Sequence, residues 1–161
     1  MKIELPMTPI VADVNQGKDS PGEHSDTEPQ NPECVVCGGD NAHGLKIVFE
    51  VRPDGSAADW IPRKGWESYR GIIHGGIISA VLDEAMSKAL IARGHEALTA
   101  ELRVRFKDKV SVGDALRVRG WVVEIRKRII LAEASLCKDS GVEIAHAWGS
   151  FLVPRSVSKD V

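Results

Sequence analysis

The chain has little cysteine and none of the usual marks of an exported or membrane protein. Its 161 residues include three cysteines, which is too few, and of the wrong parity, for a disulfide scaffold. It has no run of about eighteen apolar residues that would form a transmembrane helix. Its first residues do not combine a basic segment with a following apolar one, as a secretory signal does. We therefore expect a cytoplasmic protein with reduced thiols.

The chain also lacks a strong excess of basic charge. Residues 1–33 carry two basic and seven acidic side chains, a net charge of −5, whereas the remainder has a net charge of +3. A nucleic-acid-binding domain would need a clustered basic surface. The mildly basic remainder is compatible with a small anionic ligand instead.

The composition predicts one folded domain with an N-terminal extension. Hydrophobic residues make up 43% of the chain, which is enough for a core. Residues 15–33 are almost devoid of them and cannot offset the entropy of ordering. We expect a poorly structured acidic extension over residues 1–33, a domain over 34–154 and a short tail over 155–161. Residues 1–30 should be dispensable for folding, although the apolar strip 3–11 is able to pack on a neighbour.

Hydrophobic patterning predicts strands on both sides of one helix. The helix is expected over 77–92, where eleven of sixteen residues are apolar and lie all round its axis, which is typical of a buried helix. Alternation and turn residues predict strands over 45–52, 57–61, 101–107, 116–124, 129–138 and 142–153. We expect an α+β domain in which an antiparallel sheet wraps a central helix, with the last four strands forming a meander. A partner subunit would cover the rest of the helix.

The start of that helix is where we expect chemistry. Gly75 and Gly76 precede it, so its first backbone N–H groups should be open to an anion or oxyanion. Asp83 lies within the most apolar stretch, where a carboxylate is costly, and Ser79 and Ser87 share its helix face. A structural interpretation also stands, in which the glycines only relieve crowding and Asp83, like its neighbour Glu84, points to water.

Three segments resemble a known family. They are HGGIISAVLDEAM, with an acid nine residues after the histidine, the opening CVVCGGDNAHGL, and TAELRVRFKDKVSVGD at 99–114. Together they resemble the phenylacetate-type acyl-CoA thioesterases of the hotdog-fold 4-hydroxybenzoyl-CoA thioesterase superfamily, over residues 34–153. The resemblance implies a hotdog fold and hydrolysis of an acyl-CoA thioester. It also implies a homodimer or homotetramer with the active site at the subunit interface, and no cofactor beyond the coenzyme A of the substrate.

The resemblance also implies roles for individual residues. Asp83 takes the place of the catalytic carboxylate, acting as nucleophile or through an activated water, and the Gly75 N–H takes that of the group that polarises the thioester carbonyl. His74 would shape the turn beside the thioester, and Thr99 and Ser87 would position the water or the carboxylate. The remaining implied contacts, with substrate, are Ile73, Gly76 and Ser68. Ser68 stands where several relatives have an amide side chain, and Ala42 replaces a proline of the opening motif.

Other residues have two interpretations each. Cys34 and Cys37 have metal-ligand spacing, but no second cysteine pair follows, and only His24 and His43 lie near in sequence, so we expect no metal and no redox role. The basic residues 126–128 form either a solvated turn or a contact for coenzyme A phosphates. Trp60 and Trp66 line an acyl pocket or pack in the core. The main functional alternative is a non-catalytic acyl-CoA-binding protein.

Overall fold

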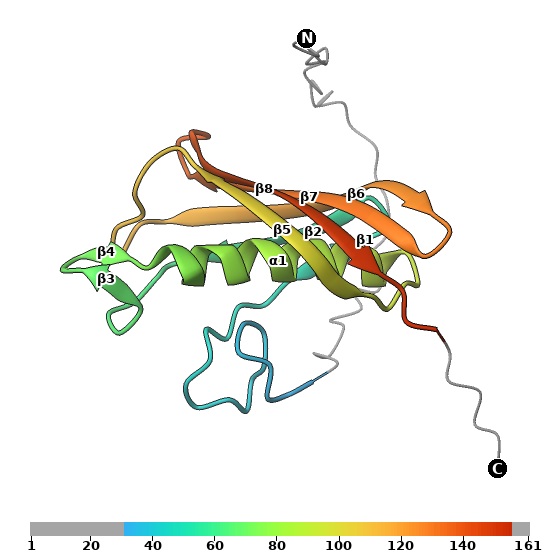
Figure 1. Cartoon of the computed structure of the whole chain (residues 1–161). Helices are drawn as coiled ribbons and strands as arrows, with labels where there is room; N and C mark the ends of the chain where they lie inside the picture. Colours follow the sequence, from blue (N-terminus) through green and yellow to red (C-terminus); the bar gives the residue numbers. More distant parts are fainter. Residues whose placement is uncertain (1–30, 156–161) are drawn as a thin grey trace, which may run out of the picture.

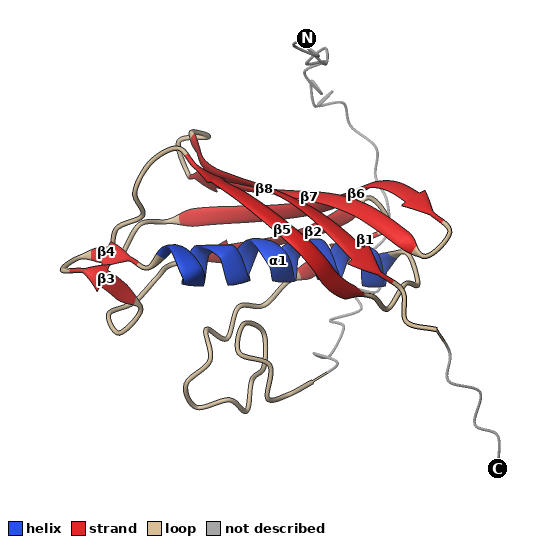
Figure 2. Ribbon diagram, in the orientation of Figure 1, coloured by secondary structure: helices blue, strands red, loops and turns tan. Residues whose placement is uncertain are grey.

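Six antiparallel strands curve around one long helix in the computed structural model, which describes residues 31–155 (Figure 1, Figure 2). The expected hotdog arrangement is therefore confirmed. Residues 1–30 of the predicted extension and 156–161 of the predicted tail lie outside the described residues, so the predictions for both segments stay predictions. Among the described residues no helix is long and apolar enough to cross a membrane.

The helix, α1, runs over Gly75–Ala92. The strands are β1 (Glu50–Arg52), β2 (Gly55–Trp60), β3 (Glu67–Tyr69), β4 (Ile72–Ile73), β5 (Leu98–Phe106), β6 (Leu116–Arg126), β7 (Ile129–Lys138) and β8 (Glu143–Leu152). The segment before the helix, which we expected to be a loop, thus contains the short β3–β4 hairpin.

The strand order in the main sheet is β1-β2-β6-β7-β8-β5. The expected four-strand meander is wrong for β5. Only β6, β7 and β8 are neighbours in the sheet in the order in which they follow one another in the chain. β5 lies at the far edge and pairs with β8, for example Leu102 opposite Gly149. Alternation within a strand identifies its buried face but carries no information about its neighbour, so this pairing was not readable from the sequence.

The strand expected over 45–52 is mostly outside the sheet. Only Glu50–Arg52 pairs with β2. The preceding residues pair with the cysteine loop instead: the Leu45 N–H donates to the Val35 carbonyl at 2.8 Å and the Ile47 N–H to the Val36 carbonyl at 2.9 Å. We name residues 34–49 the cover segment, because they lie across α1 on the side away from the sheet (Figure 1).

The cover segment explains the all-round apolar helix. Its buried side chains, which join the same core as the helix and the sheet, are Val36, Leu45, Ile47 and Phe49. Of the residues of α1, Gly76 alone is classed as exposed, so the predicted burial on every side is confirmed. Much of the helix surface that we assigned to a partner subunit is thus covered by the chain itself.

The sheet and helix touch backbone to backbone at Gly120 of β6. A Cβ added there would lie 2.3 Å from the Ala85 carbonyl oxygen, which also accepts a 2.6 Å hydrogen bond from the Ser56 hydroxyl. Because the atoms nearest to this added Cβ belong to the backbone of α1, the helix itself would have to shift to make room for it.

We expect Gly120→Ala to lower the free energy of unfolding by about 3 kcal/mol, the upper range for overpacking a rigid core. Gly39→Ala is the matched control, because nothing lies within 4 Å of its added Cβ. It should change stability by less than about 0.5 kcal/mol. Urea unfolding of both variants measures the difference, and equal midpoints would contradict the close contact.

Candidate active site

The N-terminus of α1 is capped by its own histidine. His74 is the N-cap, and its Nδ1 accepts a hydrogen bond from the Gly76 N–H at 2.8 Å. The expectation that both glycine N–H groups are open is therefore wrong for Gly76. No hydrogen-bond partner for the Gly75 N–H is found among residues 31–155. One polarised donor thus remains available at the helix start.

A hollow of about 350 Å³ lies beside Gly75. Its lining is Ile72, Ile73, Gly75, Ile78, Phe106, Lys107, Asp108, Lys109 and Val110. The Phe106 ring would be 3.4 Å from a Cβ added at Gly75, which is ordinary van der Waals contact. Most of the lining is apolar, and two lysines and one aspartate contribute to it.

Asp83 lies two turns further along α1 and is half-buried. Its Oδ1 accepts a 2.9 Å hydrogen bond from the Thr99 hydroxyl on β5. Burial raises the pKa of Asp83, the hydrogen bond from Thr99 opposes that rise, and the neighbouring Glu84 charge adds to it. The structure thus joins two of the expected residues from different elements.

The other expected residues do not join this pair. The Ser79 hydroxyl donates to the Gly75 carbonyl at 2.9 Å. No hydrogen bond links Ser87 to Asp83 within the described chain. Ser68 is exposed on β3, and the side chain of Ile73 is in the core, 3% exposed. Ile73 is therefore available to a ligand mainly through its backbone.

Gly75 and Asp83 are far apart within one chain. They are eight residues apart on the same helix, which corresponds to about 12 Å along its axis. A single carbonyl group cannot contact both groups of one chain, because a hydrogen bond reaches only about 3 Å.

The Asp83–Thr99 pair lies at the open edge of the sheet. Thr99 is on β5, a nine-residue edge strand, whereas the opposite edge strand, β1, has three residues. β5 also has two exposed apolar side chains, Leu98 and Phe106. Long unpaired edges of this kind present a row of backbone donors and acceptors to another strand.

A second cluster, which sequence reasoning missed, surrounds Glu84. Glu84 does not point to water: it forms a 3.5 Å ion pair with Lys88 and accepts from the Cys34 thiol at 3.8 Å. Burial, together with the hydrogen bond and negative charge of Glu84, raises the pKa of the nearby Cys37 thiol to about 12. The sequence did contain a signal for this cluster, because Glu84 and Lys88 are an acid and a base four residues apart within an apolar helix.

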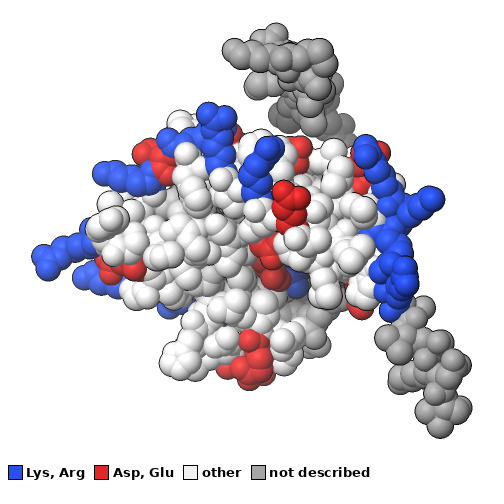
Figure 3. All heavy atoms as spheres, in the orientation of Figure 1, with Lys and Arg blue, Asp and Glu red and all other residues white. Residues whose placement is uncertain are grey.

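The remaining candidates lie outside the Asp83–Thr99 pair and the Glu84 cluster. Trp60 is buried in the core. Trp66 is half-buried, with the Arg63 guanidinium carbon 5.5 Å from its ring. In the β6–β7 turn, Arg126 pairs with Glu124 and Arg128 donates to the Val153 carbonyl. Figure 3 shows basic side chains gathered over this turn and, at the other end of the same face, over the β3–β4 hairpin.

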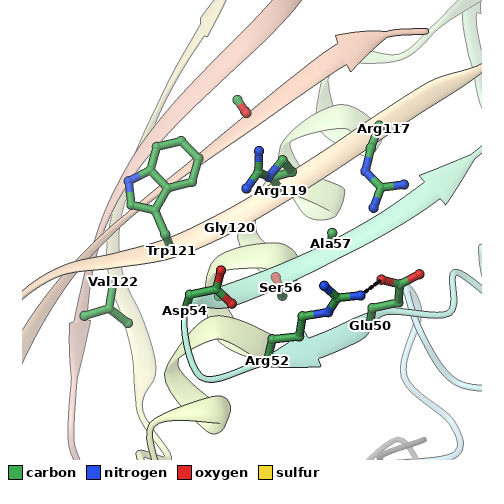
Figure 4. Close-up of a pocket in the computed structure, with 12 residues that line it drawn as sticks. Glu50, Arg52, Asp54, Ser56, Ala57, Arg117, Arg119, Gly120, Trp121 and Val122 are labelled. Carbon is green, nitrogen blue, oxygen red and sulfur yellow. Dashed lines mark hydrogen bonds and ion pairs between the residues drawn. The ribbon is translucent and has the colours of Figure 1, made fainter. Parts of the chain in front are cut away.

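A further hollow, of about 630 Å³, is formed by β1, β2 and β6 (Figure 4). None of the expected site residues lines it. Two of its arginines are already paired, Arg52 with Glu50 at 3.3 Å and Arg117 with Asp59 at 2.8 Å. We therefore place the candidate site at α1 and β5 and not here.

The family model for the thioesterase superfamily matches residues 70–145, which include α1, β5, β6 and β7. No curated protein matches the chain.

Solved structures share the fold. A thioesterase superfamily protein superposes with a TM-score of 0.72 at 20% identity over 75% of this chain, which spans 60% of that protein's length. A hypothetical thioesterase from Streptococcus pneumoniae, solved with coenzyme A, has a TM-score of 0.64 at 16% identity, covering 67% of this chain and 85% of its own. A Streptococcus mutans protein bound to acetyl-CoA has a TM-score of 0.64 at 18% identity, covering 67% and 88%. With its six-stranded sheet around one helix, the chain has the hotdog fold of these structures, and residues 70–145 are similar to the thioesterase superfamily.

Proposed function

We propose that the protein is an acyl-CoA thioesterase that hydrolyses its substrate to a free acid and coenzyme A. The observation that carries the proposal is the half-buried Asp83 carboxylate, held by the Thr99 hydroxyl at 2.9 Å beside an open sheet edge. A charge in such a place is costly unless it serves a purpose. Coenzyme A and acetyl-CoA in two structures of the same fold support the class of ligand.

The spacing of this pair also supports the proposal. Structures of the Streptococcus pneumoniae protein have been solved with an aspartate and with a threonine replaced by alanine, and these two positions are sixteen residues apart. Asp83 and Thr99 have the same separation. The same two residue types thus recur at the same interval in a protein of the same fold.

The proposed chemistry needs two groups at the thioester. The Asp83 carboxylate attacks the carbonyl carbon directly, or removes a proton from a water that attacks it. The negative charge that develops on the carbonyl oxygen is stabilised by the Gly75 N–H at the helix start. On the direct route the carbon–sulfur bond breaks to leave a mixed anhydride on Asp83, which water then hydrolyses to restore the carboxylate. On the water route the carbon–sulfur bond breaks as the acid forms. On both routes the coenzyme A sulfur takes up a proton and water supplies one oxygen of the released acid.

The two groups must come from different copies of the chain. Within one chain they are about 12 Å apart along α1. We infer a dimer that pairs through the long β5 edge and places the helix start of one copy near Asp83 of the other. Larger assemblies of such dimers fit the same requirement. A mass of 17.5 kDa in solution, that of one chain, would contradict this arrangement.

The direct test is thiol release from a panel of acyl-CoA esters, from short aliphatic to aryl. We expect hydrolysis of at least one class. If the protein binds coenzyme A esters but releases no thiol from any of them, it is a binding protein and the proposal fails.

Mixed dimers test whether the site is shared. One chain carries Asp83→Asn and the other Gly75→Pro, which removes the N–H. If each site takes one group from each copy, random mixing restores one intact site in half of the dimers, or about a quarter of the parent activity. If both groups act within one chain, mixing restores nothing. Light scattering before and after exchange confirms that the chains associate.

A further inference from the structure

Four polar side chains gather where the cover segment crosses α1. Cys34, Cys37 and Glu84 each offer one ligand atom, and these atoms all lie within 4.8 Å of one another. The fourth member, Lys88, is buried and 3.5 Å from Oε1 of Glu84. None of them takes part in the proposed hydrolysis.

The backbone around Cys34 holds its sulfur in a fixed position. The N–H groups of Val36 and Cys37 point at the Cys34 sulfur, at 3.4 and 3.5 Å. The Gly38 N–H closes the turn on the Cys34 carbonyl at 3.0 Å. A Cβ at Gly38 would lie 2.4 Å from the Cys34 nitrogen, so this tight turn requires glycine. The loop thus fixes the Cys34 sulfur beside Glu84.

We propose that Cys34, Cys37 and Glu84 bind one Zn²⁺ ion, with water as the fourth ligand. Zinc–sulfur bonds of about 2.3 Å and zinc–oxygen bonds of about 2.0 Å in a tetrahedron separate ligand atoms by about 3.5–3.8 Å. The 3.8 Å from the Cys34 sulfur to Glu84 Oε2 is ~0.3 Å longer than the sulfur–oxygen separation in such a tetrahedron, so a small closing movement would suffice. Two thiolates and a carboxylate form a mixed donor set that suits zinc.

The charges balance when the ion is bound. Zn²⁺ with two thiolates and one carboxylate carries one negative charge, and Lys88 supplies the compensating positive charge. The two carboxylate oxygens of Glu84 contact different partners: Oε2 lies near the Cys34 sulfur and Oε1 near the Lys88 ammonium group. A buried charge without a partner is strongly destabilising, so neutrality favours the bound state.

A redox disulfide fits the same cysteines less well. Reactive dithiols lie in electropositive surroundings that favour the thiolate. Here a carboxylate oxygen is 3.8 Å from the Cys34 sulfur, and Lys88, the nearby cation, is already paired with that carboxylate. A metal ion would reverse this electrostatic balance, because it binds the carboxylate and the sulfurs together.

The site would join the cover segment to the helix. Cys34 and Glu84 are 50 residues apart in the chain, and Glu84 is next to Asp83. Metal binding would therefore close a long loop and hold the cover segment on α1, which is a structural role even though one position of the ion is held by water.

The test uses the full-length protein, purified under reducing conditions and stripped with a chelator. We expect it to bind one Zn²⁺ per chain in a competition titration and to melt at a higher temperature with the ion bound. Co²⁺ in its place should give the thiolate charge-transfer and tetrahedral absorption bands. Cys34→Ser, Cys37→Ser and Glu84→Gln should each weaken binding by more than about 100-fold. Cys137→Ser is the matched control, because this third free cysteine is on β7 and outside the cluster.

Several results would overturn the proposal. The first is that the parent protein binds neither Zn²⁺ nor Co²⁺ at stoichiometric concentration. Another is Cys137→Ser weakening binding as much as Cys34→Ser. A Cys34–Cys37 disulfide, found by mass spectrometry as the stable form in a glutathione buffer of cytosolic potential, would replace it with a redox pair. The spectrum of the parent protein decides the matter even if a variant fails to fold. Since zinc binding is measured directly, the outcome is independent of thioesterase activity.

Discussion

Asp83→Asn is expected to lower kcat by ~10²–10⁴-fold, because it removes either a positioned base or the nucleophile itself. The substitution keeps the size of the side chain, and asparagine Oδ1 can still accept the hydrogen bond from Thr99. Thiol release at saturating substrate measures the change.

Folding should survive this substitution. Burial raises the pKa of Asp83 in the folded chain, so the ionised carboxylate costs stability at neutral pH, and asparagine removes that cost. The urea midpoint should be no lower than that of the parent protein. A variant that folds normally and retains near-parent activity would show that Asp83 is not the catalytic acid.

The control for this experiment should be a carboxylate elsewhere. Glu84 is adjacent in sequence, but it is paired with the buried Lys88, and its loss would leave that charge unpaired. Asp59→Asn is better, because Asp59 is an exposed residue of β2 that pairs with Arg117. Its activity should stay within about twofold of the parent, as for most surface ion pairs.

Gly75→Pro is expected to lower kcat by ~10²–10³-fold, the usual cost of losing one oxyanion donor. Proline removes the single N–H under test, and the first position of a helix tolerates it. The preceding His74 has φ −65° and ψ 134°, the extended conformation that proline requires of its predecessor. The helix should therefore form as before.

Gly75→Ala separates the loss of the N–H from the gain of a side chain. Its Cβ would make a 3.4 Å contact with the Phe106 ring, and it keeps the N–H. We expect Gly75→Ala to retain most of its activity, with circular dichroism of both variants matching the parent. Equal activity of the alanine and proline variants would exclude the Gly75 N–H from the mechanism.

The secondary structure was largely encoded in local pattern. β7 has the predicted bounds, 129–138, because its side chains alternate between core and surface and the turns at both ends are strong. The buried helix followed from its apolar residues, which leave no polar face to turn toward water. It starts two residues early, at Gly75, because His74 caps it with a hydrogen bond to Gly76.

The sequence by itself determined the fold class, the central helix and the position of Asp83 on it, because these depend on periodicity and on spacing along one element. Tertiary structure alone decided which strand flanks Asp83: β5 lies at the edge and supplies Thr99. It also decided that the cover segment returns across α1 and brings Cys34 to Glu84. Such contacts join residues far apart in the chain, and they arise from the packing of whole faces, which no local pattern records.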